Sequence, residues 1–331
     1  MRLSRRAARP ALRLLRLAAL LALVAFAAFA LLRLSPVDPV AAYLGPGIAR
    51  LGPEQRAAIE AAWGLDRPAG VQFLRWLGRI LSGDLGWSTS QNAPVAAVIA
   101  ERGAATLRLA LPALVLSGLL GFALGLAAGA REGSRLDRAV RLYAYVLAAT
   151  PTFWLAIVFL TVFSVQLGWA PLCCSGPIGV TPDAVTWSQR LAHLALPLAV
   201  LTLFGVAQVS LHTRAKVAET MRSDHALFAF AQGATRRDVA LRHAARAALA
   251  PALTIVCASL GEILGGTVLA EQVFAYPGLG RAGVAAGVQG DVPLLLALTL
   301  LAAALVAIGN LAADLLYPRV DPRLRSEGAR L

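Results

Sequence analysis

The sequence predicts an all-α membrane protein with six transmembrane helices. Of its 331 residues, 58% are hydrophobic and only 15% are charged, which is not the composition of a soluble globular domain. A helix needs about 20 apolar residues to cross a bilayer, and six windows are long enough to qualify. They are Leu17–Leu32, Leu109–Ala130, a span inside Leu142–Pro182, Leu191–Thr213, Pro251–Ala270 and Val292–Ala313.

The basic residues orient these spans. About two thirds of the 31 lysine and arginine residues fall in four segments: 1–16, 130–141, 212–248 and 317–331. The two short loops between them, 167–190 and 273–292, carry one base each. Because basic loops stay on the cytoplasmic side, the pattern predicts N-in, C-in topology. The net charge of +13 therefore reflects topology and does not indicate a nucleic-acid partner.

The predicted organisation follows the chain. Residues 1–34 form a basic cytoplasmic N-terminus and the first transmembrane helix, and residues 35–103 form a periplasmic segment. Residues 104–317 make a five-helix core with a cytoplasmic loop at 212–250, and residues 318–331 form a cytoplasmic tail. The basic start also allows a cleaved signal peptide, and Ala28-Phe29-Ala30 resembles a cleavage site. Cleavage would leave five spans, so retention as a span is favoured.

The periplasmic segment shows structure of its own. Pro53–Ala62 is helix-like, and Pro68 can begin another helix, in which Phe73, Leu77 and Ile80 line one side. Its tryptophans suit a cap that lies near the lipid headgroups: Trp63, Trp76 and Trp87. A spacer without function is the alternative.

The cytoplasmic loop Asp224–Pro251 has the pattern of two short helices around a glycine. Ser223 or Asp224 can cap the first helix, and Gly233 can end it in a left-handed turn. Thr235 and Asp238 form a capping box for the second helix.

The first of these two helices carries large apolar side chains on what should be its aqueous side: Leu227, Phe228 and Phe230. Either a partner protein buries them, or they pack beneath the ends of the chain's own spans.

Several kinds of chemistry are missing from the sequence. No Gly-x-x-x-x-Gly-Lys-Ser/Thr motif is present, and the only lysine, Lys216, precedes valine, so the chain has no such ATP site. The glycines Gly278, Gly280 and Gly283 follow Tyr276-Pro277 in a loop and not a strand, so they are interpreted as tight turns. No catalytic motif is found, which excludes an enzyme.

The three cysteines predict no disulfide framework, since Cys173 and Cys174 are adjacent and Cys257 lies inside a span. A metal site formed by Cys173, Cys174 and His193 is conceivable but disfavoured, and no metal is predicted.

Candidate residues for a transport pathway lie in the apolar windows. Glu262 is costly inside a span and sits beside Gly265 and Gly266, which let a helix or substrate approach. It can face a cationic group in a pathway, or it can hydrogen-bond a neighbouring helix. Pro151 breaks the third span and either lines the pathway or fits the bundle. Gly121, Gly125 and Gly129 repeat the spacing of close helix packing.

The cytoplasmic loop resembles the signature ("EAA") loop of binding-protein-dependent ABC importer permeases. The residues that carry this resemblance are Asp224, Ala231-Gln232-Gly233, Arg242-His243-Ala244 and Pro251. Further motifs are similar to the dipeptide/oligopeptide/nickel branch, and they run from about Leu32 to Arg325. They are Leu65-Asp66-Arg67-Pro68, Gly83-Asp84-Leu85-Gly86, Pro151-Thr152-Phe153-Trp154, Ala270-Glu271-Gln272-Val273-Phe274, Pro277-Gly278-Leu279-Gly280 and Asp321-Pro322-Arg323.

The resemblance implies a type I importer permease that lies in a bacterial inner membrane and forms half of a translocation pathway. It implies a second homologous permease subunit in a heterodimer, cytoplasmic ATPase subunits that hold ATP and Mg²⁺, and a periplasmic or lipid-anchored solute-binding protein. The chain itself binds no cofactor. The residues implied to couple to the ATPase are Asp224, Leu227, Phe228, Ala229, Phe230, Ala231, Gly233, Arg237, Arg242 and His243. In the family, positions 227, 230 and 232 are often polar or basic, so this chain suggests an ATPase with a more apolar groove.

The resemblance leaves the substrate open between di- or oligopeptides, which are favoured, and nickel or a metal chelate. A stand-alone secondary transporter is the alternative from another class. That class favours several intramembrane ionisable groups and internal repeats, which the sequence does not show.

Overall fold

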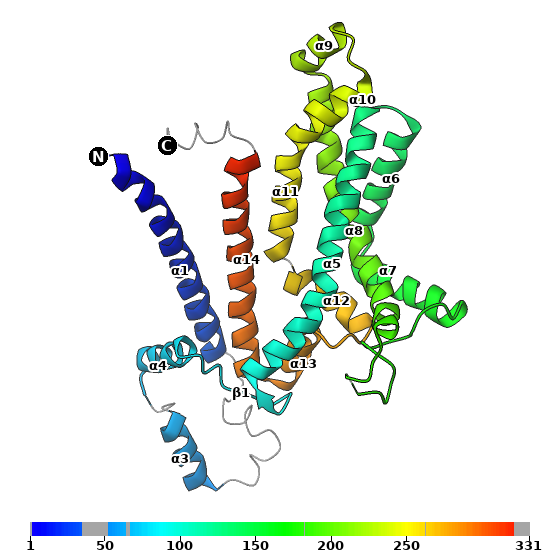
Figure 1. Ribbon diagram of the computed structural model, residues 1–331. Helices are drawn as coiled ribbons and strands as arrows, with labels where there is room; N and C mark the ends of the chain where they lie inside the picture. Colours follow the sequence, from blue (N-terminus) through cyan, green and yellow to red (C-terminus); the bar gives the residue numbers. More distant parts are fainter. Residues whose placement is uncertain (1, 35–51, 64–66, 182, 262, 321–331) are drawn as a thin grey trace. The chain divides into compact units, whose positions relative to one another are not determined.

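The computed structural model describes the whole chain except residues 1, 35–51, 64–66, 182, 262 and 321–331 (Figure 1). The described residues are mostly helical, as predicted. The N-terminal elements are α1 (Arg2–Leu34), α3 (Pro53–Trp63), α4 (Ala69–Leu81), β1 (Trp87–Ser88), β2 (Ala93–Pro94) and α5 (Val95–Ala130). The middle of the chain forms α6 (Arg135–Ala149), α7 (Thr152–Phe159), the π-helix η2 (Leu160–Gln166) and α8 (Trp187–Met221). The remaining elements are α9 (Asp224–Ala231), α10 (Arg236–Val239), the π-helix η3 (Ala240–Ala244), α11 (Ala245–Gly261), α12 (Ile263–Val273), α13 (Leu279–Gln289) and α14 (Val292–Val320).

Within the described residues, four helices are long and apolar enough to cross a membrane, and a fifth span results if the bent pair α6 and α7–η2 is counted as one. The apolar part of α1, Leu17–Leu31, is shorter than a full span. Each of the six predicted windows coincides with at least one helix among the described residues. The number of six spans, the N-in, C-in topology and the periplasmic segment remain predictions.

The chain divides into two compact units, residues 1–104 with 281–307 and residues 105–280 with 308–331. In the first unit, β1 and β2 form a small antiparallel hairpin in which Trp87 faces Pro94. The fully buried Asp291 accepts hydrogen bonds from the Ser90 backbone N–H at 3.0 Å and from the Leu294 N–H at 3.2 Å. Asp291 therefore caps the start of α14 and ties the hairpin to it.

The second unit contains the close packing that the glycine spacing in α5 predicts. A Cβ atom built on Gly121 would lie 2.7 Å from the Val209 side chain, and one on Gly125 would lie 2.6 Å from the Ser210 carbonyl oxygen. A Cβ atom on Gly129 would lie 2.6 Å from the Arg214 carbonyl oxygen. All three glycines thus lie against α8, and the prediction of a helix-packing stripe is confirmed.

The third predicted span is broken more sharply than a proline kink. α6 ends at Ala149, α7 begins at Thr152 after Pro151, and the two helices are bent by 102°. The residue before a proline is pushed to extended backbone, and Thr150 has ψ 126°. The π-helix η2 then continues α7 to Gln166.

Candidate functional site: the exposed loop between α8 and α11

The candidate site is the loop that joins α8 to α11 in the second unit. It consists of α9, α10 and η3, and Figure 1 shows α9 beyond the ends of α10 and α11. The predicted pair of short helices around Gly233 is therefore present.

The turn after α9 is held by backbone geometry. Gly233 has φ +85°, the left-handed conformation that glycine adopts without a steric penalty. Its N–H donates to the Phe230 carbonyl at 2.9 Å, and the Ala234 N–H donates to the Ala229 carbonyl at 3.0 Å. These two bonds form a Schellman motif, which satisfies carbonyls at the helix end. The prediction for Gly233 is confirmed.

The helix starts follow the predicted capping positions with one difference. Thr235 and Asp238 form the predicted capping box, with the Asp238 N–H donating to Thr235 Oγ1 at 3.2 Å. Ser223 occupies the N-cap position of α9, but its hydroxyl donates to the Thr220 carbonyl at 2.7 Å and makes no capping bond. The Ser223 hydroxyl therefore bonds to the last turn of α8 and does not accept a hydrogen bond from the start of α9.

The loop presents apolar side chains to its surroundings. Leu227 is 57% exposed and Phe228 is 66% exposed, whereas Ala226 is buried against the rest of the unit. Phe230 is half-buried. Of the two predicted alternatives, packing beneath the chain's own helices therefore applies in part to Phe230 but not to Leu227 or Phe228.

The other residues predicted to couple to a partner also lie on this loop. Ala229 is half-buried, whereas the remaining residues are exposed: Asp224, Ala231, Arg237, Arg242 and His243. Arg242 and His243 lie on η3, where the backbone is wound as a π-helix.

A small apolar core supports the loop from below. Val217 of α8, Ala244 at the end of η3 and Ala248 of α11 are fully buried, and Phe122 and Leu126 of α5 pack against them. Small residues here let α8 approach α11 closely, which fixes the base from which α9 projects.

A charged network near the same end of α8 was missed by the sequence analysis. Arg214 Nε donates to Asp137 Oδ1 at 2.7 Å, and its Nη2 donates to Asp137 Oδ2 at 2.9 Å. Asp137 is fully buried and also accepts a 2.9 Å bond from the Gly133 N–H. Ser134, three residues before Asp137, is the N-cap of α6 and was the available sequence signal, but nothing local identified Arg214 as the partner.

The predicted pathway residues are placed only in part. Glu262 lies outside the described residues, and Gly265 lies in α12. Gly266 lines a cavity with a volume of about 230 Å³ in the second unit. Pro151 precedes α7 and is exposed, while its neighbour Thr152 lines the cavity.

The lining of this cavity is apolar with neutral polar groups. It comes from α5, the start of α7, α8, α11 and α12. The polar side chains that line it are Ser117, Thr152, Gln208, Ser259 and Thr267. Among the described residues, the lining contains no charged side chain.

The glycines interpreted as tight turns instead allow a close approach to a buried acid. Glu271 is fully buried, and it accepts a 2.7 Å bond from Thr106 Oγ1, which itself accepts the Leu279 N–H at 2.8 Å. A Cβ atom on Gly278 would lie 2.2 Å from the Glu271 carboxyl group. The left-handed residue of this turn is Ala275, with φ 48°. Glu271 therefore joins α12 to α5 and to the start of α13.

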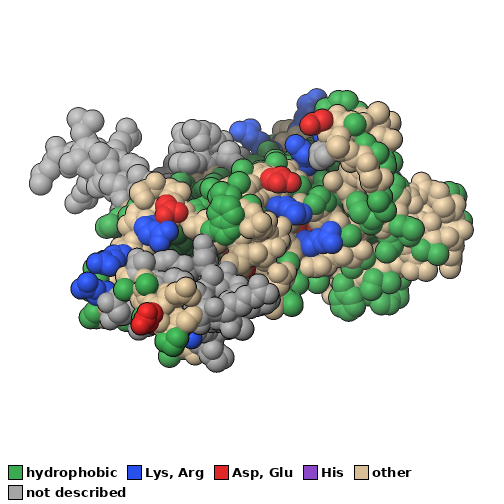
Figure 2. All heavy atoms as spheres, turned by 90° about the horizontal axis from the view of Figure 1, so that it is seen from below, with side chains coloured by type: hydrophobic (Ala, Val, Ile, Leu, Met, Phe, Trp, Pro, Cys, Tyr) green, Lys and Arg blue, Asp and Glu red, His purple; other side chains and the backbone are tan. Residues whose placement is uncertain are grey.

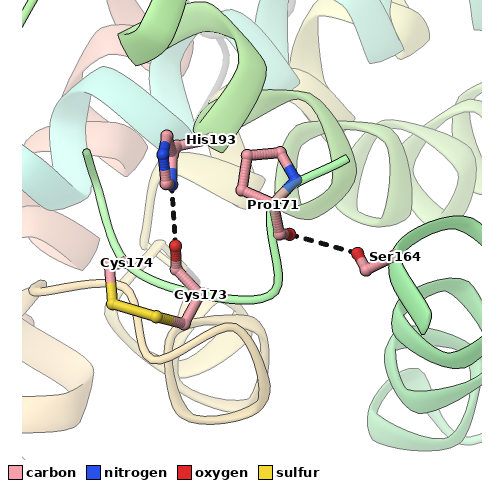
Figure 3. Close-up of a disulfide and its surroundings, with 5 residues drawn as sticks. All are labelled: Ser164, Pro171, Cys173, Cys174 and His193. Atoms are coloured by element: carbon pink, nitrogen blue, oxygen red, sulfur yellow. Dashed lines mark hydrogen bonds between the residues drawn. A yellow bond between two sulfur atoms is a disulfide. The ribbon is translucent and has the colours of Figure 1, made fainter. Parts of the chain in front are cut away.

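Cys173 and Cys174 form a disulfide with each other, a single bond between neighbours and not the framework that the cysteine count argued against (Figure 3). Cys174 has φ 76°, and its N–H donates to the Phe274 carbonyl at 2.9 Å. His193 Nδ1 lies 2.7 Å from the Cys173 carbonyl oxygen. The sulfur atoms are thus bonded to each other, and the residues that were considered for a metal site instead anchor the loop to α8 and to the end of α12.

Comparison with protein families gives one match that covers more than half of the chain. Residues 121–326 match the family described as binding-protein-dependent transport system inner membrane component. This range contains the loop between α8 and α11, Glu271, and most of the residues that line the cavity, whereas Thr106 and the α5 residues of the lining precede it.

Curated relatives extend the similarity toward the N-terminus. The chain is 34% identical over 290 residues to the oligopeptide transport system permease protein AppB of Bacillus subtilis, covering 87% of this chain and 90% of that protein. It is 36% identical over 293 residues to a putative peptide permease protein of Brucella suis, covering 88% and 90%. A probable peptide ABC transporter permease protein of Sinorhizobium fredii is 32% identical over 290 residues, with 88% and 90% covered. The chain therefore belongs to the family of binding-protein-dependent transport inner membrane components.

Proposed function

We propose that this chain is the membrane-spanning permease subunit of an ATP-driven importer of peptides. The family assignment supports the transport role, and the relatives described above are named oligopeptide or peptide permeases. In this role the chain forms half of a translocation pathway, and a second homologous permease forms the other half.

The loop between α8 and α11 is the docking element for the cytoplasmic ATPase. The observation that carries this proposal is the exposure of Leu227 and Phe228 on α9, a helix held at its end by the Gly233 turn. Burying one such side chain in a partner's groove contributes about 1.5–3 kcal/mol, which favours a bound state. Arg237 and Arg242 lie on the adjoining helices and are exposed beside it.

The chain's contribution to ATP-driven transport is mechanical. Closure of an ATPase pair on nucleotide binding moves α9, and the apolar core around Val217 and Ala244 transmits that motion to α8 and α11. Rigid helices with two packed arrangements carry such a change between distant sites. The cavity that Gly266 and Gln208 line is the part of the pathway that this motion opens to one side or the other.

Two alternatives are less well supported. A nickel or metal-chelate importer is compatible with the family, but the relatives described above carry peptide names. A stand-alone secondary transporter needs no binding protein, and the family description names dependence on one.

The substitution Phe228→Asp tests the docking proposal. A charge in place of an exposed phenyl ring leaves the fold intact because Phe228 is 66% exposed, but it prevents burial in an apolar groove. The ATPase activity of the reconstituted complex, measured with the loaded binding protein, should lose its stimulation. Ala57→Asp on the exposed face of α3 is the matched control and should retain stimulation.

Unchanged stimulation with Phe228→Asp would reject the docking role of α9. The substrate class is tested separately by uptake into vesicles that hold the complete transporter. Uptake of a labelled oligopeptide that excess unlabelled peptide abolishes is expected, whereas uptake of ⁶³Ni²⁺ alone would overturn the peptide assignment.

A further inference from the structure

The helix α4 has two apolar surfaces, and only one of them is covered by the rest of the first unit. The covered surface packs on α1 through aromatic rings. Phe73 lies 5.6 Å from Phe26 and 5.5 Å from Phe29, and Trp76 lies 5.9 Å from Phe29. Figure 1 shows α4 lying across the end of α1. Edge-on and tilted aromatic contacts at these distances are favourable beyond their buried area.

The second apolar surface of α4 is exposed. Leu74 is 67% exposed and Leu81 is 79% exposed. They are seven residues apart, so they lie on the same side of the helix, next to the covered side. Val71 is exposed close by, and Gly70 and Gly78 leave this flank without other large side chains. An amphipathic helix in water hides its apolar side, so this flank needs a further covering surface.

The remaining side of α4 is basic. Arg75 and Arg79 are exposed and lie one turn apart. Arg79 Nη2 is 2.8 Å from Asp84 Oδ2, and this guanidinium, together with the Gly86 N–H, lowers the pKa of the Asp84 carboxyl group. The helix therefore changes from apolar to cationic around its circumference, which is the pattern of helices that lie in a membrane surface.

The contact between α4 and α1 identifies the covering surface. Phe26 lies in the apolar part of α1, Leu17–Leu31, and is itself 56% exposed. Leu20 and Leu23 of the same helix are also exposed. In an inner membrane component, the exposed apolar side chains of such a helix face lipid. Because Phe73 touches Phe26, the exposed flank of α4 continues a surface that already faces acyl chains.

We propose that α4 lies in the membrane–water interface and binds the lipid surface. Leu74 and Leu81 enter the acyl region, and Arg75 and Arg79 lie among the headgroups. Arginine stems follow this division, since their apolar part stays with the lipid while the charge reaches water. The helix thereby holds the first unit at a fixed depth beside the end of α1.

A second helix of the same unit provides the contrast. α3 carries Glu54, Arg56 and Glu60, with an Arg56–Glu60 ion pair of 2.8 Å between partly exposed side chains. The exposed side chains described in α3 are charged, polar or small and include no leucine, so we take it as an aqueous helix. Figure 2 shows charged and apolar side chains close together on the face seen from the end that carries α3 and α4.

Site-directed spin labelling of the full chain tests the proposal. Cys173 and Cys174 are bonded to each other and Cys257 is buried, so an introduced cysteine is the accessible thiol, and the unsubstituted protein measures residual labelling. Leu74→Cys and Leu81→Cys report on the exposed flank of α4. Leu23→Cys on α1 is the lipid reference, and Ala58→Cys on α3 is the aqueous reference.

The labelled protein, purified with its associated subunits, is placed in vesicles of phosphatidylethanolamine and phosphatidylglycerol. Accessibility to oxygen, which partitions into acyl chains, and to a water-soluble nickel chelate is then measured. Labels at 74 and 81 should show a several-fold higher ratio of oxygen to chelate accessibility than the label at 58, approaching but not exceeding the ratio at 23.

Two outcomes would overturn the proposal. A ratio equal to that at 58 would mean that α4 lies in water. Low accessibility to both reagents would mean that a protein surface, and not lipid, covers the flank. The same labels are also measured in the Phe228→Asp variant. The accessibility at 74 and 81 should be unchanged there, because lipid contact by α4 does not require ATPase docking.

Discussion

Arg214 of α8 binds Asp137 of α6 through two parallel hydrogen bonds of 2.7 and 2.9 Å. The carboxylate is fully buried, and the arginine side chain is 17% exposed. Bidentate geometry fixes both distance and orientation, so this pair sets how α6 lies against α8. Since α8 leads directly into α9, the pair also helps to fix the base of the loop between α8 and α11.

Replacing Asp137 by asparagine removes the negative charge but keeps the size of the side chain. The Arg214 guanidinium then lacks its buried counter-charge, and removal of one partner of a buried pair costs about 3–5 kcal/mol. A loss near 3 kcal/mol is expected here because Glu132 remains 3.3 Å from Arg214. Denaturant titration of the purified permease in detergent measures it.

Arg141 provides the control for that substitution. Its Nε lies 3.7 Å from Asp137 Oδ2 and the side chain is partly exposed, so Arg141→Gln should cost less than about 1 kcal/mol. Equal losses for the two substitutions would show that the bidentate pair has no special role.

Gly125 tests the close packing of α5 on α8. An alanine Cβ atom would lie 2.6 Å from both the Ser210 carbonyl oxygen and Thr213 Cβ, so the helices must separate. Overpacking of this kind costs about 1–3 kcal/mol, measured as a lower midpoint of thermal unfolding. Gly287→Ala in α13 faces open space and should stabilise its helix by about 0.5–1 kcal/mol. A stable Gly125→Ala variant would contradict the packing.

Gly278 and Glu271 should show strong coupling. Gly278→Ala alone places a methyl group 2.2 Å from the Glu271 carboxyl carbon and is expected to destabilise the protein. Glu271→Ala alone removes the acceptor of the Thr106 hydroxyl. In the double variant the clash disappears, so the combined loss should fall short of the sum by about 0.5–3 kcal/mol. Additive losses in a double-mutant cycle would argue against direct contact.

Gly233 tests the turn that holds α9. At φ +85° an alanine is strained by about 1–2 kcal/mol, and the end of α9 loosens. Docking to the ATPase should then weaken by up to about tenfold, read from the ATPase concentration that gives half-maximal stimulation. Asparagine tolerates the left-handed region, so Gly233→Asn should lose less than Gly233→Ala. The reverse order would exclude backbone strain as the cause.

The bond between Cys173 and Cys174 predicts a specific labelling pattern. Iodoacetamide added without a reductant should leave both cysteines unmodified. A dithiol reduces the disulfide and is itself oxidised to a disulfide. After this treatment, iodoacetamide should alkylate both thiols. Mass spectrometry of the peptide that spans residues 142–190 distinguishes the two states. Alkylation before reduction would show that the pair is not bonded.

Local patterns in the sequence predicted local structure well. The Gly233 turn, the Thr235–Asp238 capping box and the glycine stripe of α5 each depend on residues within one turn or one helix. Such features are set by backbone sterics and nearby hydrogen bonds, which short stretches of sequence specify.

Contacts between distant residues were not predicted. No local pattern in the sequence pairs Asp137 with Arg214 or Glu271 with Thr106, because the partners lie 77 and 165 residues apart. The sequence indicated no disulfide framework and left the role of Cys173 and Cys174 open, and the structure bonds these two adjacent residues to each other. Pro151 predicted a kink, but not a bend of 102°.

By itself the sequence determined that this protein is a helical membrane component, where its apolar segments lie, and which loop is built as two capped helices. Those properties follow from hydrophobic periodicity and from the backbone preferences of glycine, proline and capping residues. Only the tertiary structure decided which side chains are left uncovered. Leu227 and Phe228 are exposed on α9, whereas Phe230 is half-buried, since exposure depends on the helices that pack against each residue and not on the residue type.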